Sequence, residues 1–98
     1  MFFLQNIYSC LEICKLIIEN TDDKNPADRN GMTPFHRAAE YGHLDICKLI
    51  IQNVEDKNPS SNDRSTPLHW AAENGNLEVT TKIFGVLFEE CKKLWGFT

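Results

Sequence analysis

The sequence lacks both a long apolar run and an excess of basic residues. It holds 10 Lys and Arg against 14 Asp and Glu, a formal net charge of −4 at pH 7, so it has no concentrated basic field to attract phosphate backbones or anionic lipids. No uninterrupted apolar segment approaches the length that a bilayer span requires. We therefore expect a chain that binds no nucleic acid and does not insert into membranes.

Catalytic and metal-binding motifs are missing as well. There is no phosphate-binding loop, dinucleotide fingerprint or nucleophile elbow, and no Cys-x-x-Cys, His-x-x-x-His or His-Glu pair has metal-ligand spacing. We predict that the protein is not an enzyme and uses neither a metal nor a cofactor. The alternative, a redox function of the cysteines, would need an exposed thiol with a lowered pKa.

Four cysteines occur, at Cys10, Cys14, Cys47 and Cys91. Cys14 and Cys47 lie 33 residues apart in matching apolar segments, which is typical of one buried helical position used twice. We expect reduced, structural thiols and therefore a cytoplasmic, reducing environment. No signal peptide is expected, because the apolar segment Met1 to Leu4 has no basic residues before it and is soon interrupted by polar ones.

What the sequence does contain is an internal repeat. Residues 11–43 laid over 44–76 without gaps are identical at 19 of 33 positions. Repetition of this period predicts a stack of similar units, each burying its apolar face against the next. Three blocks recur: Leu-x-Ile-Cys-Lys-Leu-Ile-Ile from Leu11 and Leu44, Asp-Lys-Asn-Pro from Asp23 and Asp56, and Thr-Pro-x-His from Thr33 and Thr66.

Each unit contains the signals of two helices. Thr33 can cap a helix whose first residue, Pro34, needs no backbone donor. Ala38 and Ala39 leave little side-chain bulk on that helix, so neighbouring helices can approach closely, and Gly42 ends it in the left-handed conformation. The same residues recur 33 positions later. These signals predict two narrow inner helices, each followed at once by a second helix.

The second helix of each unit is apolar over most of its surface. Asp45, Lys48 and Gln52 share one face at spacings of three and four, and aliphatic residues and cysteine fill the rest, so the helix needs neighbours on both sides. Before the inner helix, Asp28-Arg-Asn-Gly31 has the residues of a tight turn. This segment fits a projecting hairpin finger.

The pattern Asp28-x-x-Gly-x-Thr-Pro-Phe-His-x-Ala-Ala-x-x-Gly-His-Leu, ending near Asn58, resembles an ankyrin repeat. The resemblance covers residues 27–59 fully, 60 to about 84 well, and 11–26 as the second half of an earlier repeat. It implies an all-α solenoid of helix-turn-helix units with short hairpin fingers, whose concave side and fingertips bind proteins. It also implies that His36 and His69 form hydrogen bonds within and between fingers and are not catalytic.

Three segments follow from the resemblance. Residues 1–26 form a degenerate amino-terminal repeat with its second helix clear from residue 11, 27–59 form an intact repeat, and 60–98 form a repeat with an altered, extended carboxy-terminal helix. In the second finger Arg64 replaces the expected glycine, which predicts a strained non-glycine residue at positive φ, at roughly 1 kcal/mol. A shift of the turn to Asn62 or Asp63 is the alternative.

Two further departures concern the second helices. Asn20 and Asn53 are the predicted left-handed residues after them, because Thr21 and Val54 fill the family's glycine position. We interpret the segment from Leu77 as carrying an extra residue relative to the segment from Leu44, which predicts a rotation of its downstream face by about 100°. An apolar and an opposing polar face follow at helical spacing, with Phe84, Leu87, Phe88, Cys91, Leu94 and Trp95 on the first and Glu78, Lys82, Glu89 and Lys92 on the second.

We interpret the chain as a protein–protein interaction module, an adaptor or scaffold that binds another protein. Tyr41 and Trp70 are the strongest contact candidates, because aromatic side chains bury much area for little lost entropy; packing between repeats is the alternative for Trp70. The expected contact positions lie on the fingertips and inner helices, and most differ between repeats: Arg29, Asn30, Met32, Arg37, Glu40, Tyr41, Asn62, Asp63, Ser65, Trp70, Glu73 and Asn74.

Two other interpretations stay open. Solenoids ordinarily need about three repeats and polar capping units, so the first alternative is a structural fragment of a longer ankyrin array in a channel, a ligase subunit or a scaffold. The second is self-association through the apolar ends, because exposed apolar surface is usually covered.

Overall fold

The structure, a computed structural model, describes residues 15–16 and 18–96. Its described part contains no strand, so the all-α prediction is confirmed. The first half of the predicted amino-terminal repeat, with Cys10 and Cys14, lies outside the described residues. Residues 15–16 and 18–20 are helical, and the helices that follow are α2 (Pro34–Tyr41), α3 (Leu44–Asn53), α4 (Pro67–Glu73) and α5 (Leu77–Leu94).

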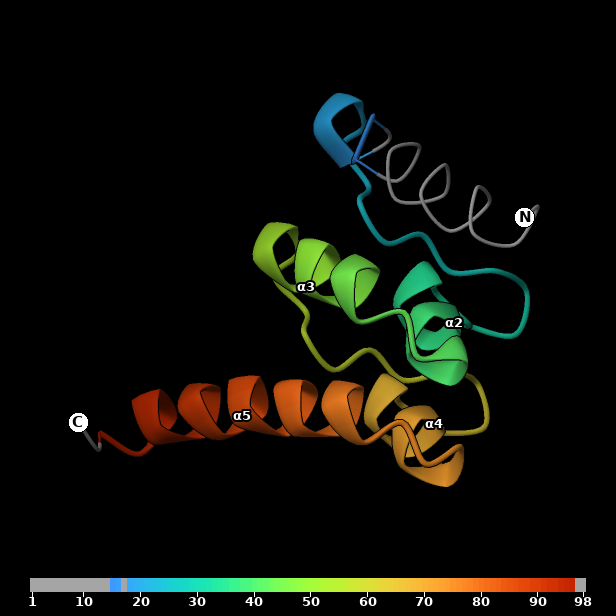
Figure 1. Cartoon of the computed structure of the whole chain (residues 1–98). Helices are drawn as coiled ribbons and strands as arrows, with labels where there is room; N and C mark the ends of the chain where they lie inside the picture. Colours follow the sequence, from blue (N-terminus) through green and yellow to red (C-terminus); the bar gives the residue numbers. More distant parts are fainter. Residues whose placement is uncertain (1–14, 17, 97–98) are drawn as a thin grey trace.

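The helices form two stacked pairs (Figure 1). The inner helices α2 and α4 lie side by side, the outer helices α3 and α5 do the same, and the loops that lead into α2 and α4 project beyond those helices. This is the helix-turn-helix stacking that the repeat predicts. Among the described helices, none has the combination of length and apolarity needed to cross a bilayer.

The inner helices begin and end where the sequence predicts. The Thr33 side chain accepts a hydrogen bond from the His36 N–H, the His36 ring accepts one from the Thr33 N–H, and Pro34 opens α2. This reciprocal arrangement is a capping box. Gly42 ends α2 with φ 73°. The same cap recurs at Thr66 of α4, so one local sequence specifies both helices.

The outer helix α3 ends differently from the prediction. Val54 follows it in an extended conformation, and Asn53 is not left-handed, because Arg64 is the only described non-glycine residue with positive φ. Instead, the Asn53 amide donates to the Leu49 carbonyl (2.7 Å), and the Lys57 ammonium donates to the carbonyls of Ile51 (3.0 Å) and Val54 (2.6 Å). A lysine thus satisfies the carbonyls that a glycine cap would otherwise satisfy.

The same capping recurs at the end of the preceding helical turn. The Asn20 amide donates to the Leu16 carbonyl (2.7 Å), and the Lys24 ammonium donates to the carbonyls of Ile18 and Thr21. Asn20 is not left-handed either. The recurring Asp-Lys-Asn-Pro block is therefore explained in part by the lysine cap.

The core lies between the two helix pairs. Phe35, Ile50 and Ile83 are its largest fully buried apolar side chains, and Ala39 of α2 and Ala71 of α4 have no exposed surface. Burial of each large side chain stabilises the fold by about 1.5–3 kcal/mol. The small alanines let the inner helices pack closely, as predicted.

The predicted rotation within α5 is wrong. Val79 and Ile83 are buried, and these positions match Ile46 and Ile50 of α3 without any shift. The helix begins after Gly75 just as α3 begins after Gly42, so its register is set at its start. Consequently Phe84 faces away from the core and is 61% exposed.

Candidate protein-binding surface

The loop before α2 forms the first finger, residues 28–32. The Asp28 carboxylate accepts hydrogen bonds from the backbone N–H groups of Asn30 (2.8 Å) and Met32 (3.0 Å), which confirms the predicted turn chemistry. Gly31 turns with φ 77°, and a Cβ there would lie 2.8 Å from the Asn62 Oδ1. Glycine is therefore needed for the turn and for the close approach of the second finger.

The second finger, residues 61–65, makes its turn without glycine. Arg64 has φ 68°, which confirms the strained position predicted from the replacement of glycine. The Ser61 hydroxyl donates to the Asp63 carboxylate and accepts from the Ser65 N–H (3.1 Å). Hydrogen bonds from Ser61, and then from Ser65, hold the pKa of the Asp63 carboxyl below its usual value, because they stabilise the charged form.

Asn62 joins the two fingertips. Its backbone N–H donates to the Asn30 carbonyl (2.8 Å), and its side-chain amide donates to the Arg29 carbonyl (2.9 Å). Three of the predicted contact residues, Arg29, Asn30 and Asn62, therefore hold the two fingers together. The tips form one continuous surface.

His36 forms a second link between the repeats. Its Nδ1 accepts from the Thr33 N–H (3.1 Å), and its Nε2 lies 2.9 Å from the Ser65 carbonyl oxygen. Because a carbonyl can only accept, Nε2 carries the proton and donates. The ring is completely buried. This confirms the hydrogen-bonding role that the resemblance implied for His36.

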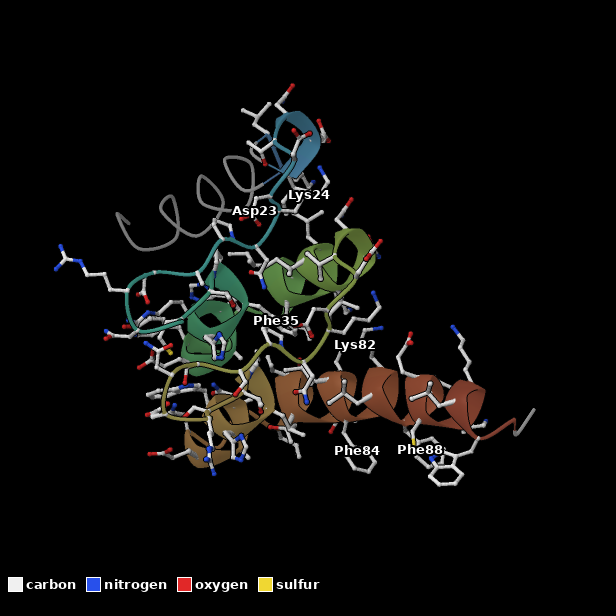
Figure 2. All side chains as sticks on the ribbon, turned by 180° about the vertical axis from the view of Figure 1, so that it is seen from behind. Asp23, Lys24, Phe35, Lys82, Phe84 and Phe88 are labelled. Carbon is white, nitrogen blue, oxygen red and sulfur yellow. The ribbon has the colours of Figure 1, made fainter. Side chains whose placement is uncertain are left out.

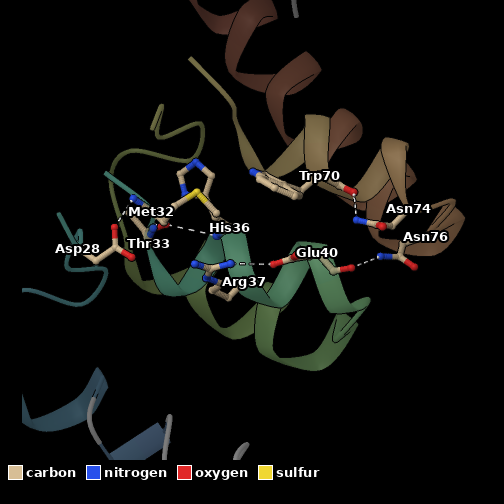
Figure 3. A network of polar contacts seen from close by, with 9 residues as sticks. All are labelled: Asp28, Met32, Thr33, His36, Arg37, Glu40, Trp70, Asn74 and Asn76. Atoms are coloured by element: carbon tan, nitrogen blue, oxygen red, sulfur yellow. Dashed lines mark hydrogen bonds and ion pairs between the residues drawn. The ribbon is translucent and has the colours of Figure 1, made fainter. Parts of the chain in front are cut away.

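Polar contacts also lie along α2 and join it to the start of α5 (Figure 3). The Arg37 guanidinium pairs with the Glu40 carboxylate at 3.1 Å along the exposed side of α2. The Asn76 amide, at the start of α5, donates to the carbonyls of Ala39 (2.8 Å) and Glu40 (3.1 Å). Sequence reasoning missed Asn76, although it differs from His43 at the matching repeat position.

A shallow groove of about 300 Å³ runs between the fingertips and the inner helices. Met32, which is only 8% exposed, and the half-buried Trp70 are its apolar members, while Arg37 and Asp63 are its charged members. The groove contains six of the twelve predicted contact residues: Asn30, Met32, Arg37, Asn62, Asp63 and Trp70. It also contains Ser61, which is not among the predicted contact residues.

The position of Trp70 is compatible with both roles predicted for it, contact with a partner and packing between the repeats. The residue is half-buried, and its Nε1 is buried with no hydrogen-bond partner in the described part of the molecule. Figure 3 shows the Nε1 edge of the indole directed toward Met32 and the first finger. The ring therefore packs between the repeats and still borders the groove.

The other six predicted contact residues lie outside the groove. Tyr41 is 66% exposed at the end of α2, with its ring centroid 6.3 Å from that of His43. The half-buried Ser65 uses its backbone within and between the fingers. The remaining four are exposed or half-buried: Arg29, Glu40, Glu73 and Asn74.

A larger cavity, of about 610 Å³, lies between the loops that contain residues 22–31 and 53–60. Asp22, Asp23, Glu55 and Asp56 line it together with Lys24. Asp23 and Asp56 each accept a hydrogen bond from the backbone two residues later, so these carboxylates have a role in the turns. Sequence reasoning did not predict this cavity, because it assigned the loops a structural role only.

The thiols divide into two kinds. Cys47 is fully buried, and burial raises its pKa to about 12, which confirms an inert, structural side chain. Cys91 is exposed on α5, so its assignment as a structural thiol is wrong. Over residues 15–16 and 18–96, no group of three His, Cys, Asp or Glu side chains could hold a metal ion.

A family model described as ankyrin repeats (3 copies) matches residues 2–87. No curated protein matches the sequence.

Proposed function

We propose that this chain, which belongs to the ankyrin-repeat family, binds another protein along the groove between its fingertips and inner helices. Ankyrin repeats are in general protein–protein interaction modules. The observation that supports this site is the groove itself, because it gathers six of the predicted contact residues from both repeats. The scaffold beneath it is fixed by the hydrogen bonds of Asn62 and His36, which favours a preformed surface.

The side chains of the groove suggest the chemistry of the partner. Met32 and Trp70 offer an apolar contact, and the Arg37 guanidinium is half-exposed beside it. Its pairing with Glu40 is a surface ion pair, worth about 0–1 kcal/mol, so an acidic group of a partner can replace it. We propose an extended segment with one apolar side chain next to an acidic residue.

The proposal includes a non-enzymatic adaptor role in a cytoplasmic, reducing compartment. The buried free thiol of Cys47 and the exposed thiol of Cys91 are compatible with a compartment where thiols stay reduced. No catalytic step is assigned to His36, since both of its ring nitrogens are used in structural hydrogen bonds.

The experiment is a comparison of partners retained by the immobilised wild-type chain and by Trp70→Ala and Arg37→Glu variants. Lys93→Ala is the control, because Lys93 lies far along α5 from the groove. We expect a partner that is retained by the wild type and the control and lost from both groove variants, with all chains showing the same helical circular dichroism. Equal retention by all four chains would reject this groove as the binding site.

A further inference from the structure

Helix α5 exposes an apolar stripe on one side. Leu77, Phe84, Phe88 and Trp95 are 75%, 61%, 54% and 73% exposed, and we call these four residues the α5 stripe. Figure 2 shows Phe84 and Phe88 on the side of α5 that faces away from α3. Their rings lie nearly parallel, with centroids 6.4 Å apart. The stripe is an unusual exposure, because soluble monomers rarely show large contiguous apolar patches.

The stripe lies where the stacking of helices would continue. Ile51 of α3 occupies the repeat position that Phe84 occupies in α5, and Ile51 is 8% exposed. It borders a cavity together with Thr81 and Lys82 of α5, so this position of an outer helix faces the next outer helix. By the same geometry, the side of α5 that bears Phe84 is suited to packing against another helix.

The length of α5 narrows the choice of the helix that covers it. Helix α3 has 10 residues and α5 has 18, which correspond to about 15 Å and 27 Å. A further outer helix of the α3 length would leave the far part of the stripe, Phe88 and Trp95, largely uncovered. A second copy of α5 has the length to cover the whole stripe.

The spacing of the stripe is the same in both directions. The residues of the stripe are separated in order by seven, four and seven positions. A second α5 laid antiparallel therefore places Leu77 of each copy against Trp95 of the other, and Phe84 of each copy against Phe88 of the other. A two-fold interface requires such self-complementarity. We propose that two copies of this chain associate through antiparallel pairing of their α5 stripes.

The charges beside the stripe favour the same arrangement. Glu78 lies near the start of α5 and Lys92 near its end, on the same flank of the stripe at 100° per residue. Antiparallel pairing about a two-fold axis places like flanks of the two helices together, so Glu78 of each copy lies near Lys92 of the other. Parallel pairing places that flank against the opposite flank of the partner helix and forms no such pair. Opposite charges on facing helices set orientation in this way.

The area is adequate for a specific dimer. A large apolar side chain has about 200 Å² of surface. The exposed fractions of the four side chains in the stripe therefore correspond to roughly 500 Å² of exposed surface per copy. Complete burial of the stripe on both copies would amount to about 1,000 Å², the lower bound for a biological interface. The fingers and the groove do not take part, so the dimer leaves the proposed protein-binding surface free.

The test is the mass of the chain in solution by sedimentation equilibrium. We expect twice the 11.3 kDa chain mass for the wild type, and a dissociation constant at least tenfold higher for a Phe84→Glu/Phe88→Glu variant with unchanged helical content. Tyr41→Glu, which changes an exposed aromatic residue elsewhere, should remain dimeric. A monomeric wild type overturns the proposal. A double variant that dimerises like the wild type overturns it too.

The orientation is tested by charge reversal and by crosslinking. Glu78→Lys and Lys92→Glu should each weaken the dimer several-fold, and the double reversal should restore most of the loss. With a mild oxidant such as diamide, a Thr80→Cys variant should form a disulfide between the introduced thiol of one copy and Cys91 of the other, identified by peptide mapping. A Cys91–Cys91 disulfide in the wild type would overturn the antiparallel pairing, because the two thiols then lie about 15 Å apart along the helix.

Discussion

His36 links the two repeats through both nitrogens of its ring. Nδ1 completes the cap of α2, and Nε2 donates to the Ser65 carbonyl of the next finger. His69 makes the same cap at Thr66, but its ring is exposed. Two histidines in the same sequence context therefore differ in how much of the structure depends on them.

We expect His36→Ala to lower the free energy of unfolding by about 1–3 kcal/mol, because it leaves the buried N–H of Thr33 and the half-buried carbonyl of Ser65 without partners. His69→Ala is the matched control and should cost less than half as much, since water can satisfy the exposed groups. Urea denaturation of the three chains measures the difference. Equal losses would show that the link to Ser65 contributes nothing to stability.

Asp63 is the residue whose ionisation the second finger controls. Removal of the hydroxyl in Ser61→Ala should raise the Asp63 pKa toward its ordinary value of about 3.9, because that hydrogen bond is the largest cause of the lowered pKa. The lowered pKa stabilises the folded chain at pH values above the carboxyl pKa of the unfolded chain. This contribution is lost as the pH falls through the carboxyl pKa of the folded chain. Carbon-detected NMR titration of the carboxyl measures the change, and an unchanged pKa would contradict it.

At the scale of single elements, the end of α3 depends on a residue outside the helix. Lys57 donates to the carbonyl of Ile51 in the last turn and to that of Val54 just after the helix, and it places a positive charge near the negative end of the helix dipole. We expect Lys57→Ala to destabilise the fold by about 1 kcal/mol. Lys48→Ala, an exposed lysine within the same helix, should change stability by less, and thermal melting of both variants compares the two losses.

The second finger carries a strained residue that the first finger avoids. Arg64→Gly should stabilise the chain by up to about 1 kcal/mol, because glycine adopts positive φ without the clash of a side chain. Gly31→Ala tests the reverse change and should be destabilising, since its Cβ would lie within 3 Å of Asn62. A melting temperature that falls for Arg64→Gly would mean that the arginine side chain contributes more than the strain costs.

At the scale of the whole molecule, the buried thiol of Cys47 gives global stability an alkaline limit. Its pKa is about 12 in the folded chain and near 8.5 when unfolded. Stability is therefore independent of this group below about pH 8 and falls above 8.5, with a slope approaching 1.4 kcal/mol per pH unit. Denaturation from pH 7 to 10 should show a steeper fall for the wild type than for Cys47→Ala; parallel curves would contradict the burial of the thiol.

The two sides of the stack differ although the repeats are alike. Ala39 is fully buried against the next repeat, whereas the matching Ala72 of α4 is exposed. Likewise, Ile51 of α3 is buried, whereas Phe84, at the matching position of α5, is exposed. Within the described residues, each position is buried only if another helix lies beyond it, so equal sequence positions have unequal environments.

Local sequence was enough to predict much of this structure. The caps at Thr33 and Thr66, the helix end at Gly42 and the strain at Arg64 depend on backbone conformation and hydrogen bonds over a few residues. These interactions are the same wherever the segment lies, so the sequence alone predicts them. The stacking of helix pairs also followed, because a repeated apolar helix has no other way to bury both of its sides.

Only the tertiary structure decided how these units meet. It replaced the expected left-handed Asn53 with a lysine cap from the next loop, and it brought Met32 and Trp70 together in one groove. Contacts of this kind join residues about one repeat apart, and their geometry depends on how closely the inner helices pack. The sequence by itself determined the repeating unit, and tertiary packing determined which copy of each residue is buried, because burial depends on the neighbour and not on the residue.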